Sequence, residues 1–128
     1  MFRARSSSEF AVVWEDERAA HQIYMGRISA TGSLIGSESP VTESPISAFN
    51  PSVAWTGSEH VITWTDNRDG NYEIYIARVS ELGVRIGSET RLSSDAALSN
   101  VSVVEWTGSE LGVAWSDNRS GNYEVYLA

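Results

Sequence analysis

The sequence predicts an all-β protein made of about two and a half copies of one unit of four short antiparallel strands. Residues 52–77 and 103–128 match at about 16 of 26 positions with a constant offset of 51 residues. Within each copy, runs of β-branched and aromatic residues alternate with clusters of Gly, Asn, Asp and Ser, which is typical of strands joined by tight turns. No segment keeps an apolar period of 3.6 residues, so we expect essentially no helix.

The second copy shows the order of these elements most clearly. Its first hairpin is expected to turn at 56–58, and a larger turn cluster follows at 66–71. Gly70 in that cluster can adopt the positive φ that a hairpin loop with a bulge requires. A third turn at 81–83 precedes a weaker, more polar outer strand. The four strands expected from this pattern cover residues 51–55, 60–64, 72–79 and 88–93.

Four strands joined by hairpins within about 50 residues match the spacing of one blade of a β-propeller. A β-sandwich also uses short strands, but it does not require near-identical units at a fixed period. We therefore predict a single all-β domain over residues 1–128, with about 2.5–3 propeller blades of four antiparallel strands. The approximate blades are residues 1–50, 51–101 and 102–128, and the last is incomplete.

We expect other copies of the chain to complete the ring of blades. Residues 2–5 align with the inner strand at 52–55, and Ala128 aligns with Ala77, so the third copy lacks its outer strand. An open stack would expose Trp, Val and Ile over more than the few hundred Å² that a monomer usually leaves bare. The expected partner is the chain itself, as a homodimer with six blades; a five-bladed ring is the alternative.

Composition excludes several classes of partner. The formal net charge is −8, from 9 Lys and Arg against 17 Asp and Glu, and it argues against binding of nucleic acid. No apolar run approaches the roughly 20 residues of a membrane helix, so no membrane partner is expected. No apolar segment follows the N-terminal arginines, so we expect a soluble chain without a signal peptide. The absence of Cys excludes disulfides but does not fix the compartment.

No cofactor or metal is expected. The sequence contains no nucleotide-binding loop and no nucleophile elbow. His21 and His60 stand at non-equivalent positions without a second His nearby, so we expect surface or partly packed side chains rather than zinc ligands. The acidic turn around Asp69 has the composition of a calcium loop, but Ser120 and Ala19 replace this aspartate in the other copies. A calcium ligand set is therefore not maintained.

Residues that recur from copy to copy are expected to serve the fold. Repeated aromatic residues on strands favour packing between blades, and a repeated Asp beside a turn favours hydrogen bonds from turn amides. A catalytic group is normally needed once, whereas a residue present in each copy serves the structure of each copy. The repeated positions are Trp14, Trp64, Trp115, Asp16, Asp66, Asp117, Gly70, Gly121, Tyr24, Tyr75 and Tyr126.

The run Trp-Thr-Asp-Asn-Arg-Asp-Gly-Asn-Tyr-Glu-Ile-Tyr at 64–75, repeated with small changes at 115–126, resembles the blade repeat of bacterial β-propellers of the TolB-like and sialidase-like kind. The resemblance covers nearly the whole chain and implies the architecture rather than one function. Longer relatives of this kind are often exported. Sialidases hold the carboxylate of their substrate with three arginines, and amphipathic tryptophans suit a sugar-binding shelf. The candidate ligand-binding residues are therefore Arg18, Arg68, Arg119, Trp55 and Trp106.

Two classes of function remain open. The first is a non-catalytic propeller that self-assembles and acts as a binding or scaffold module for a carbohydrate or a protein. The alternative is a sialidase-like or glycosidase-like hydrolase, or a truncated piece of one. No non-repeated set of Tyr, Glu and Asp suited to sialidase chemistry is identifiable, so we predict no catalytic residue and favour the binding module.

Overall fold

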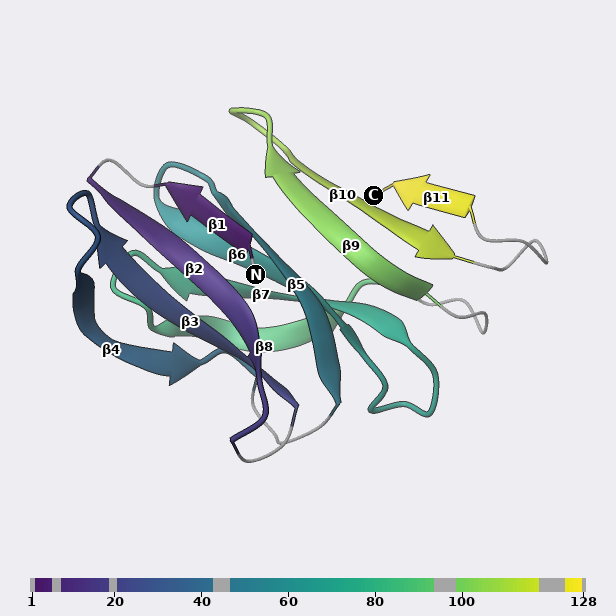
Figure 1. The fold of residues 1–128 in the computed structure, drawn as a ribbon. Coiled ribbons are helices and arrows are strands. Elements are labelled where there is room, and N and C mark those ends of the chain that lie inside the picture. Colours follow the sequence, from purple (N-terminus) through teal and green to yellow (C-terminus); the bar gives the residue numbers. More distant parts are fainter. Residues whose placement is uncertain are drawn as a thin grey trace.

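The computed structural model describes residues 2–5, 8–18, 21–42, 47–93, 99–117 and 124–127, and all regular structure among them is antiparallel β. This part of the chain forms eleven strands in three sheets and no helix, and their arrangement is drawn in Figure 1. The predicted all-β fold without helices is confirmed. No helix in the described ranges is long and apolar enough to cross a membrane.

Each sheet is a meander in which consecutive strands are hydrogen-bonded neighbours. The first sheet contains β1 (Phe2–Arg5), β2 (Glu9–Asp16), β3 (Gln22–Ser29) and β4 (Leu34–Pro40). The second contains β5 (Ala48–Trp55), β6 (Glu59–Asp66), β7 (Glu73–Ser80) and β8 (Arg85–Arg91). The third contains β9 (Ser99–Trp106), β10 (Leu111–Asp117) and β11 (Glu124–Leu127).

The four strands of the second copy lie near the expected ranges, and two of them begin three residues earlier than expected. β5 begins at Ala48 rather than at residue 51, because a β-bulge between Phe49 and Ser52 lets the strand continue through Pro51. β8 covers Arg85–Arg91 rather than 88–93, since the positive φ of Gly83 closes the preceding turn and pairing with β7 resumes at once.

The second sheet lies between the other two and contributes to two hydrophobic cores. Strand β5 packs against the first sheet, and β9 packs against the second sheet in the same way (Figure 1). Because side chains alternate along a strand, Ile62 and Trp64 face the first sheet whereas Val61 faces the third. The first core contains Ala11, Val13, Ile23, Met25, Val41, Ala48, Val53, Ile62, Trp64, Tyr75, Ala77 and Val79. The second contains Ala54, Val61, Ile74, Val104, Val113 and Trp115.

Polar contacts also join the sheets. At the first boundary, the Arg85 guanidinium donates to the carbonyl of Val41 over 2.7 Å. At the second boundary, the hydroxyl of Ser102 donates to the hydroxyl of Thr63 over 2.9 Å. Both contacts are made by residues about 40 or more positions apart, so they fix the relative placement of the sheets rather than any local turn.

The three equivalent tryptophans lie in different environments. Trp64 is 0% exposed and Trp115 is 6% exposed, because each is covered by the preceding sheet. Trp14 is only half-buried, since no described element covers the outer face of the first sheet. One repeated aromatic position therefore stands on an open sheet face.

Candidate functional site

The repeated Trp-Asp-Arg motif forms a hydrogen-bonded corner at the end of β6. Asp66 is buried, and its Oδ2 accepts the indole N–H of Trp64 over 3.0 Å. Its Oδ1 accepts the backbone N–H of Arg68 over 2.8 Å, as expected for an Asp beside a turn. The Arg68 guanidinium also donates to Oδ2 over 2.6 Å. One carboxylate thus ties the strand, the turn and the core tryptophan together.

Arg68 is further engaged within its own sheet. Its guanidinium donates to Glu89 over 2.5 Å and lies 4.0 Å from the ring centroid of Tyr75. Burial lowers the pKa of Arg68, but hydrogen bonds to Asp66 and Glu89 outweigh this effect and raise the pKa above its ordinary value. Burial and a hydrogen bond to Asp69 raise the pKa of Tyr75 to about 12. The arginine is therefore a fixed structural cation.

The first sheet repeats this corner with less burial. Asp16 accepts the indole N–H of Trp14 over 3.0 Å and the backbone N–H of Arg18 over 2.9 Å. Arg18 also pairs with Glu38 over 2.6 Å and lies 4.3 Å from the ring centroid of Tyr24. Side-chain and backbone hydrogen bonds from Arg18 lower the pKa of Asp16.

In the third sheet, Asp117 Oδ2 accepts from Trp115 over 3.4 Å and from the hydroxyl of Ser99 over 2.9 Å. Arg119 and Gly121 lie outside the described residues, and nothing is described of the Tyr126 side chain. Arg18 and Arg68 belong to separate sheets, and each forms ion pairs with carboxylates of its own sheet. These two arginines are therefore not gathered into one pocket.

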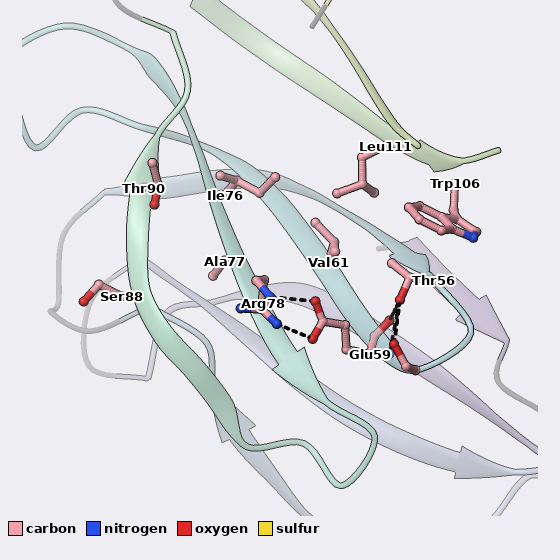
Figure 2. A pocket seen from close by; sticks show the side chains of 11 residues that line it. Thr56, Glu59, Val61, Ile76, Ala77, Arg78, Ser88, Thr90, Trp106 and Leu111 are labelled. Atoms are coloured by element: carbon pink, nitrogen blue, oxygen red, sulfur yellow. Dashed lines mark hydrogen bonds and ion pairs between the residues drawn. The ribbon is translucent and has the colours of Figure 1, made fainter. Parts of the chain in front are cut away.

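A cleft of about 440 Å³ opens between the second and third sheets (Figure 2). It lies beside the β5–β6 hairpin, the middle of β7 and the outer strand β8. Trp106, one of the predicted ligand-binding residues, stands at its edge with Leu111, at the ends of the β9–β10 hairpin. The lining residues are Thr56, Ser58, Glu59, Val61, Ile76, Ala77, Arg78, Ser88, Thr90, Trp106 and Leu111.

An ion pair forms the polar wall of this cleft. Arg78 donates from Nε to Glu59 Oε1 over 2.6 Å and from a terminal nitrogen to Glu59 Oε2 over 2.8 Å (Figure 2). This hydrogen bonding lowers the pKa of Glu59 and raises that of Arg78, so both groups stay charged near neutral pH. The Arg78 side chain is 57% exposed, which leaves the pair accessible to a bound molecule. A guanidinium has five donors and a carboxylate about four acceptor positions, so capacity remains on both partners.

The equivalent place at the first boundary holds a smaller cavity, of about 240 Å³, whose lining residues include Arg27 and Gly83. Arg27 and Glu9 form the same two-bonded pair, with contacts of 2.7 and 3.0 Å, but the Arg27 side chain is only 19% exposed. Trp55, the counterpart of Trp106, has its ring centroid 4.7 Å from that of His60. His60 is 0% exposed, so the expectation of a surface or partly packed side chain is wrong for this histidine.

The hairpin between β7 and β8 also covers the first boundary. Gly83 lies against the first sheet, where its carbonyl accepts the hydroxyl of Ser39 over 3.3 Å. The third sheet has three described strands, and no equivalent hairpin lies over the second boundary in the described part of the chain.

The sequence identified Trp106 as a candidate but missed Glu59 and Arg78. A signal was present, because Glu9 with Arg27 and Glu59 with Arg78 recur at equivalent positions of the first two copies. Among the described residues, no group of three or more His, Asp or Glu side chains is placed to hold a metal ion. No protein-family model matches this chain, and no curated protein matches it.

Proposed function

We propose that this chain is a segment of a β-propeller and acts as a non-catalytic binding module for carbohydrate. The propeller interpretation is supported by the three meanders, which stack in sequence order with the first strand of each sheet against the preceding sheet. Both boundaries use equivalent positions, as Trp64 meets the first sheet and Trp115 meets the second. Such regular stacking is how propeller blades cover one another.

Complementary open faces support closure of the ring by further copies of the chain. At each described boundary, a face carrying tryptophan packs on a face of smaller residues such as Val13 or Val61. One face of each kind is left over: the Trp14 face of the first sheet and the face of the third sheet on which Val103 is 43% exposed. The leftover faces suit each other in two identical chains, which would form a six-bladed ring. Sedimentation equilibrium at micromolar concentration should give the mass of two chains, whereas a stable monomer would overturn this assembly.

The carbohydrate proposal rests on the combination of groups in the cleft between the second and third sheets. Trp106 offers an apolar ring face at a wet edge, which suits the C–H face of a sugar. The Glu59–Arg78 pair offers fixed acceptors and donors for ring hydroxyls within the same cleft. Volumes of about 300–1,000 Å³ are typical of small-ligand sites, and this cleft lies within that range.

The sugar site can be tested by saturation-transfer difference NMR with methyl glycosides of glucose, galactose and mannose and with N-acetylglucosamine. We expect transfer to at least one sugar in the wild type, and a loss of about tenfold or more in affinity for Trp106→Ala. Leu82→Ala is the control, because Leu82 is 71% exposed and lies outside the cleft. Absence of transfer to every sugar, or equal transfer in Trp106→Ala, would refute the site.

A further inference from the structure

A second cavity, of about 380 Å³, is formed by residues of the first and second sheets. Its lining residues are Glu15 near the end of β2, Phe49 and Asn50 near the start of β5, and Tyr72 just before β7. These four are the lining residues that the structure describes.

The cavity is distinct from the repeated architecture. The positions equivalent to Glu15 in the other two copies are Thr65 and Ser116, and Asn100 stands where Phe49 stands. A residue needed by every blade recurs, as the Trp-Asp-Arg corner does. The carboxylate of Glu15 and the ring of Phe49 are present once, so the repeat itself does not explain them.

A backbone amide holds the carboxylate of Glu15 in place. Asn50 has a φ of +52°, and it is the only residue other than glycine with a positive φ in the described ranges. Asn tolerates this conformation better than most residues. In this bulged segment, its backbone N–H donates to Glu15 Oε1 over 2.8 Å. Next to it, the backbone N–H of Ala48 donates to the carbonyl of His21 over 3.0 Å, which anchors β5 to the first sheet.

Aromatic rings form the other wall. The centroids of Phe49 and Tyr72 lie 6.2 Å apart with the rings at 73°, an edge-to-face pair. The ring centroid of His21 lies 4.9 Å from that of Phe49, so the imidazole packs against the phenyl ring. Tyr72 is 37% exposed, so a bound molecule can reach its ring.

The charge of the surroundings favours a cation. The six arginines whose side chains are described all pair with carboxylates: Arg18, Arg27, Arg68, Arg78, Arg85 and Arg91. None of these pairs includes Glu15, and the sequence contains no Lys. With a formal net charge of −8, the chain keeps a surplus of negative charge that a ligand cation can balance.

We propose that this cavity binds an organic cation with an alkylated ammonium head group. The carboxylate of Glu15 would supply the Coulombic attraction, and the faces of Phe49 and Tyr72 would supply cation–π contacts. An alkylated ammonium is preferred to a metal ion because Glu15 is the one carboxylate among the described lining residues, and Phe49 and Tyr72 place aromatic rings beside it. This site is separate from the proposed sugar cleft and shares none of its lining residues.

The test is an NMR titration of the ¹⁵N-labelled full chain with choline and with its neutral isostere 3,3-dimethyl-1-butanol. We expect the backbone amide of Asn50, which donates to Glu15, and the ring protons of Tyr72 to shift and saturate with choline. Loss of the positive charge should weaken binding about tenfold in the isostere. Equal affinity for the two compounds, or no saturable shift with choline, would overturn the proposal.

Matched variants separate the local site from the general charge of the chain. Glu15→Gln keeps an oxygen acceptor for the Asn50 amide but removes the charge, so choline affinity should fall about tenfold. Tyr72→Leu should weaken binding by a similar factor through loss of the ring. Glu17→Gln removes an equal charge from a side chain that is 76% exposed and lies outside the cavity, and it should leave affinity unchanged. An equal loss in Glu17→Gln would show that only net charge matters and would refute the site.

Discussion

At the scale of single residues, His60 shows how a non-repeated side chain can be constrained by the stacking of sheets. It is 0% exposed, and among the described residues neither ring nitrogen has a hydrogen-bond partner. Trp55 lies against its ring, and Glu9 and Arg27 are the charged groups that face it. Burial lowers the pKa of His60 to about 4; the Glu9 carboxylate opposes this shift and the Arg27 guanidinium adds to it. The folded protein therefore keeps a neutral imidazole at neutral pH.

Acid should destabilise the fold through this histidine. The folded pKa lies below the ordinary value of 6.5, so the unfolded chain binds the proton first as the pH falls. The contribution of neutral His60 to the free energy of unfolding is fully present above about pH 6.5 and is lost as the pH falls toward 4. In the third copy, Leu111 stands at the position of His60. Between pH 7 and 4.5, the free energy of unfolding of His60→Leu should fall by about 2–3 kcal/mol less than that of the wild type.

Guanidinium denaturation at the two pH values measures this difference. His21→Leu is the control, because the His21 side chain is 40% exposed. If wild type and His60→Leu lose equal stability on acidification, then the imidazole is accessible to protons in the folded state and the sheets separate more readily than their packing indicates.

Of the contacts between residues, those of the Trp-Asp-Arg corner were the ones that could be predicted from the sequence. Its contacts are local, since Asp66 reaches Trp64 and Arg68 two residues away on either side. The ion pair of Glu59 with Arg78 and the cavity around Glu15 were not predicted. Both depend on side chains brought together across strands or sheets. The Glu–Arg pair recurs in the first two copies but was not recognised, and a search for repeated residues passes over Glu15, which occurs once.

At the scale of elements, turn glycines determine where strands end. Gly70 has a φ of +89°, and its backbone N–H donates to the carbonyl of Asn67 over 3.0 Å to close the turn between β6 and β7. This is the role expected from the sequence. The start of β5 was expected at residue 51 and lies at Ala48, because a bulge extends the strand through Asn50 and Pro51.

Gly70→Ala should destabilise the protein by about 1 kcal/mol through backbone strain, because a Cβ disfavours the left-handed region. No atom lies within 4 Å of the added Cβ, so steric contact does not contribute. Gly112→Ala is the matched control: its Cβ also meets nothing, and its φ is not in that region. Urea denaturation should show Gly112→Ala as stable as wild type or slightly more stable. Equal effects of the two substitutions would contradict a strained turn.

At the scale of the whole molecule, the proposed assembly depends on two outward faces. Trp14→Glu places a charge on the outer face of the first sheet, and Val103→Glu does so on the outer face of the third. If these faces meet in a closed ring, each variant should sediment as a folded single chain, because a buried unpaired charge costs several kcal/mol. Leu82→Glu, at an exposed turn, should sediment as the wild type does. A self-associated species that survives both face variants would exclude this mode of closure.

The all-β class and the four-stranded unit were predictable because they follow from local periodicity and from a repeat visible in one chain. The exposure of each repeated position could not be predicted in this way. Trp14 and Trp64 occupy the same place in their units, but only Trp64 is covered by a neighbouring sheet. Equivalent positions of the repeat therefore differ in burial, and the order of the layers decides which tryptophan is covered.

The middle position of the second sheet has a consequence for how this protein loses its structure. Both cores draw on β5, β6 and β7, so the central layer cannot leave without opening two interfaces at once. In a single unassociated chain, either outer layer can detach by opening one interface. Disorder should thus spread inward from the flanks, and the last native fragment to survive would be the layer with neighbours on both sides.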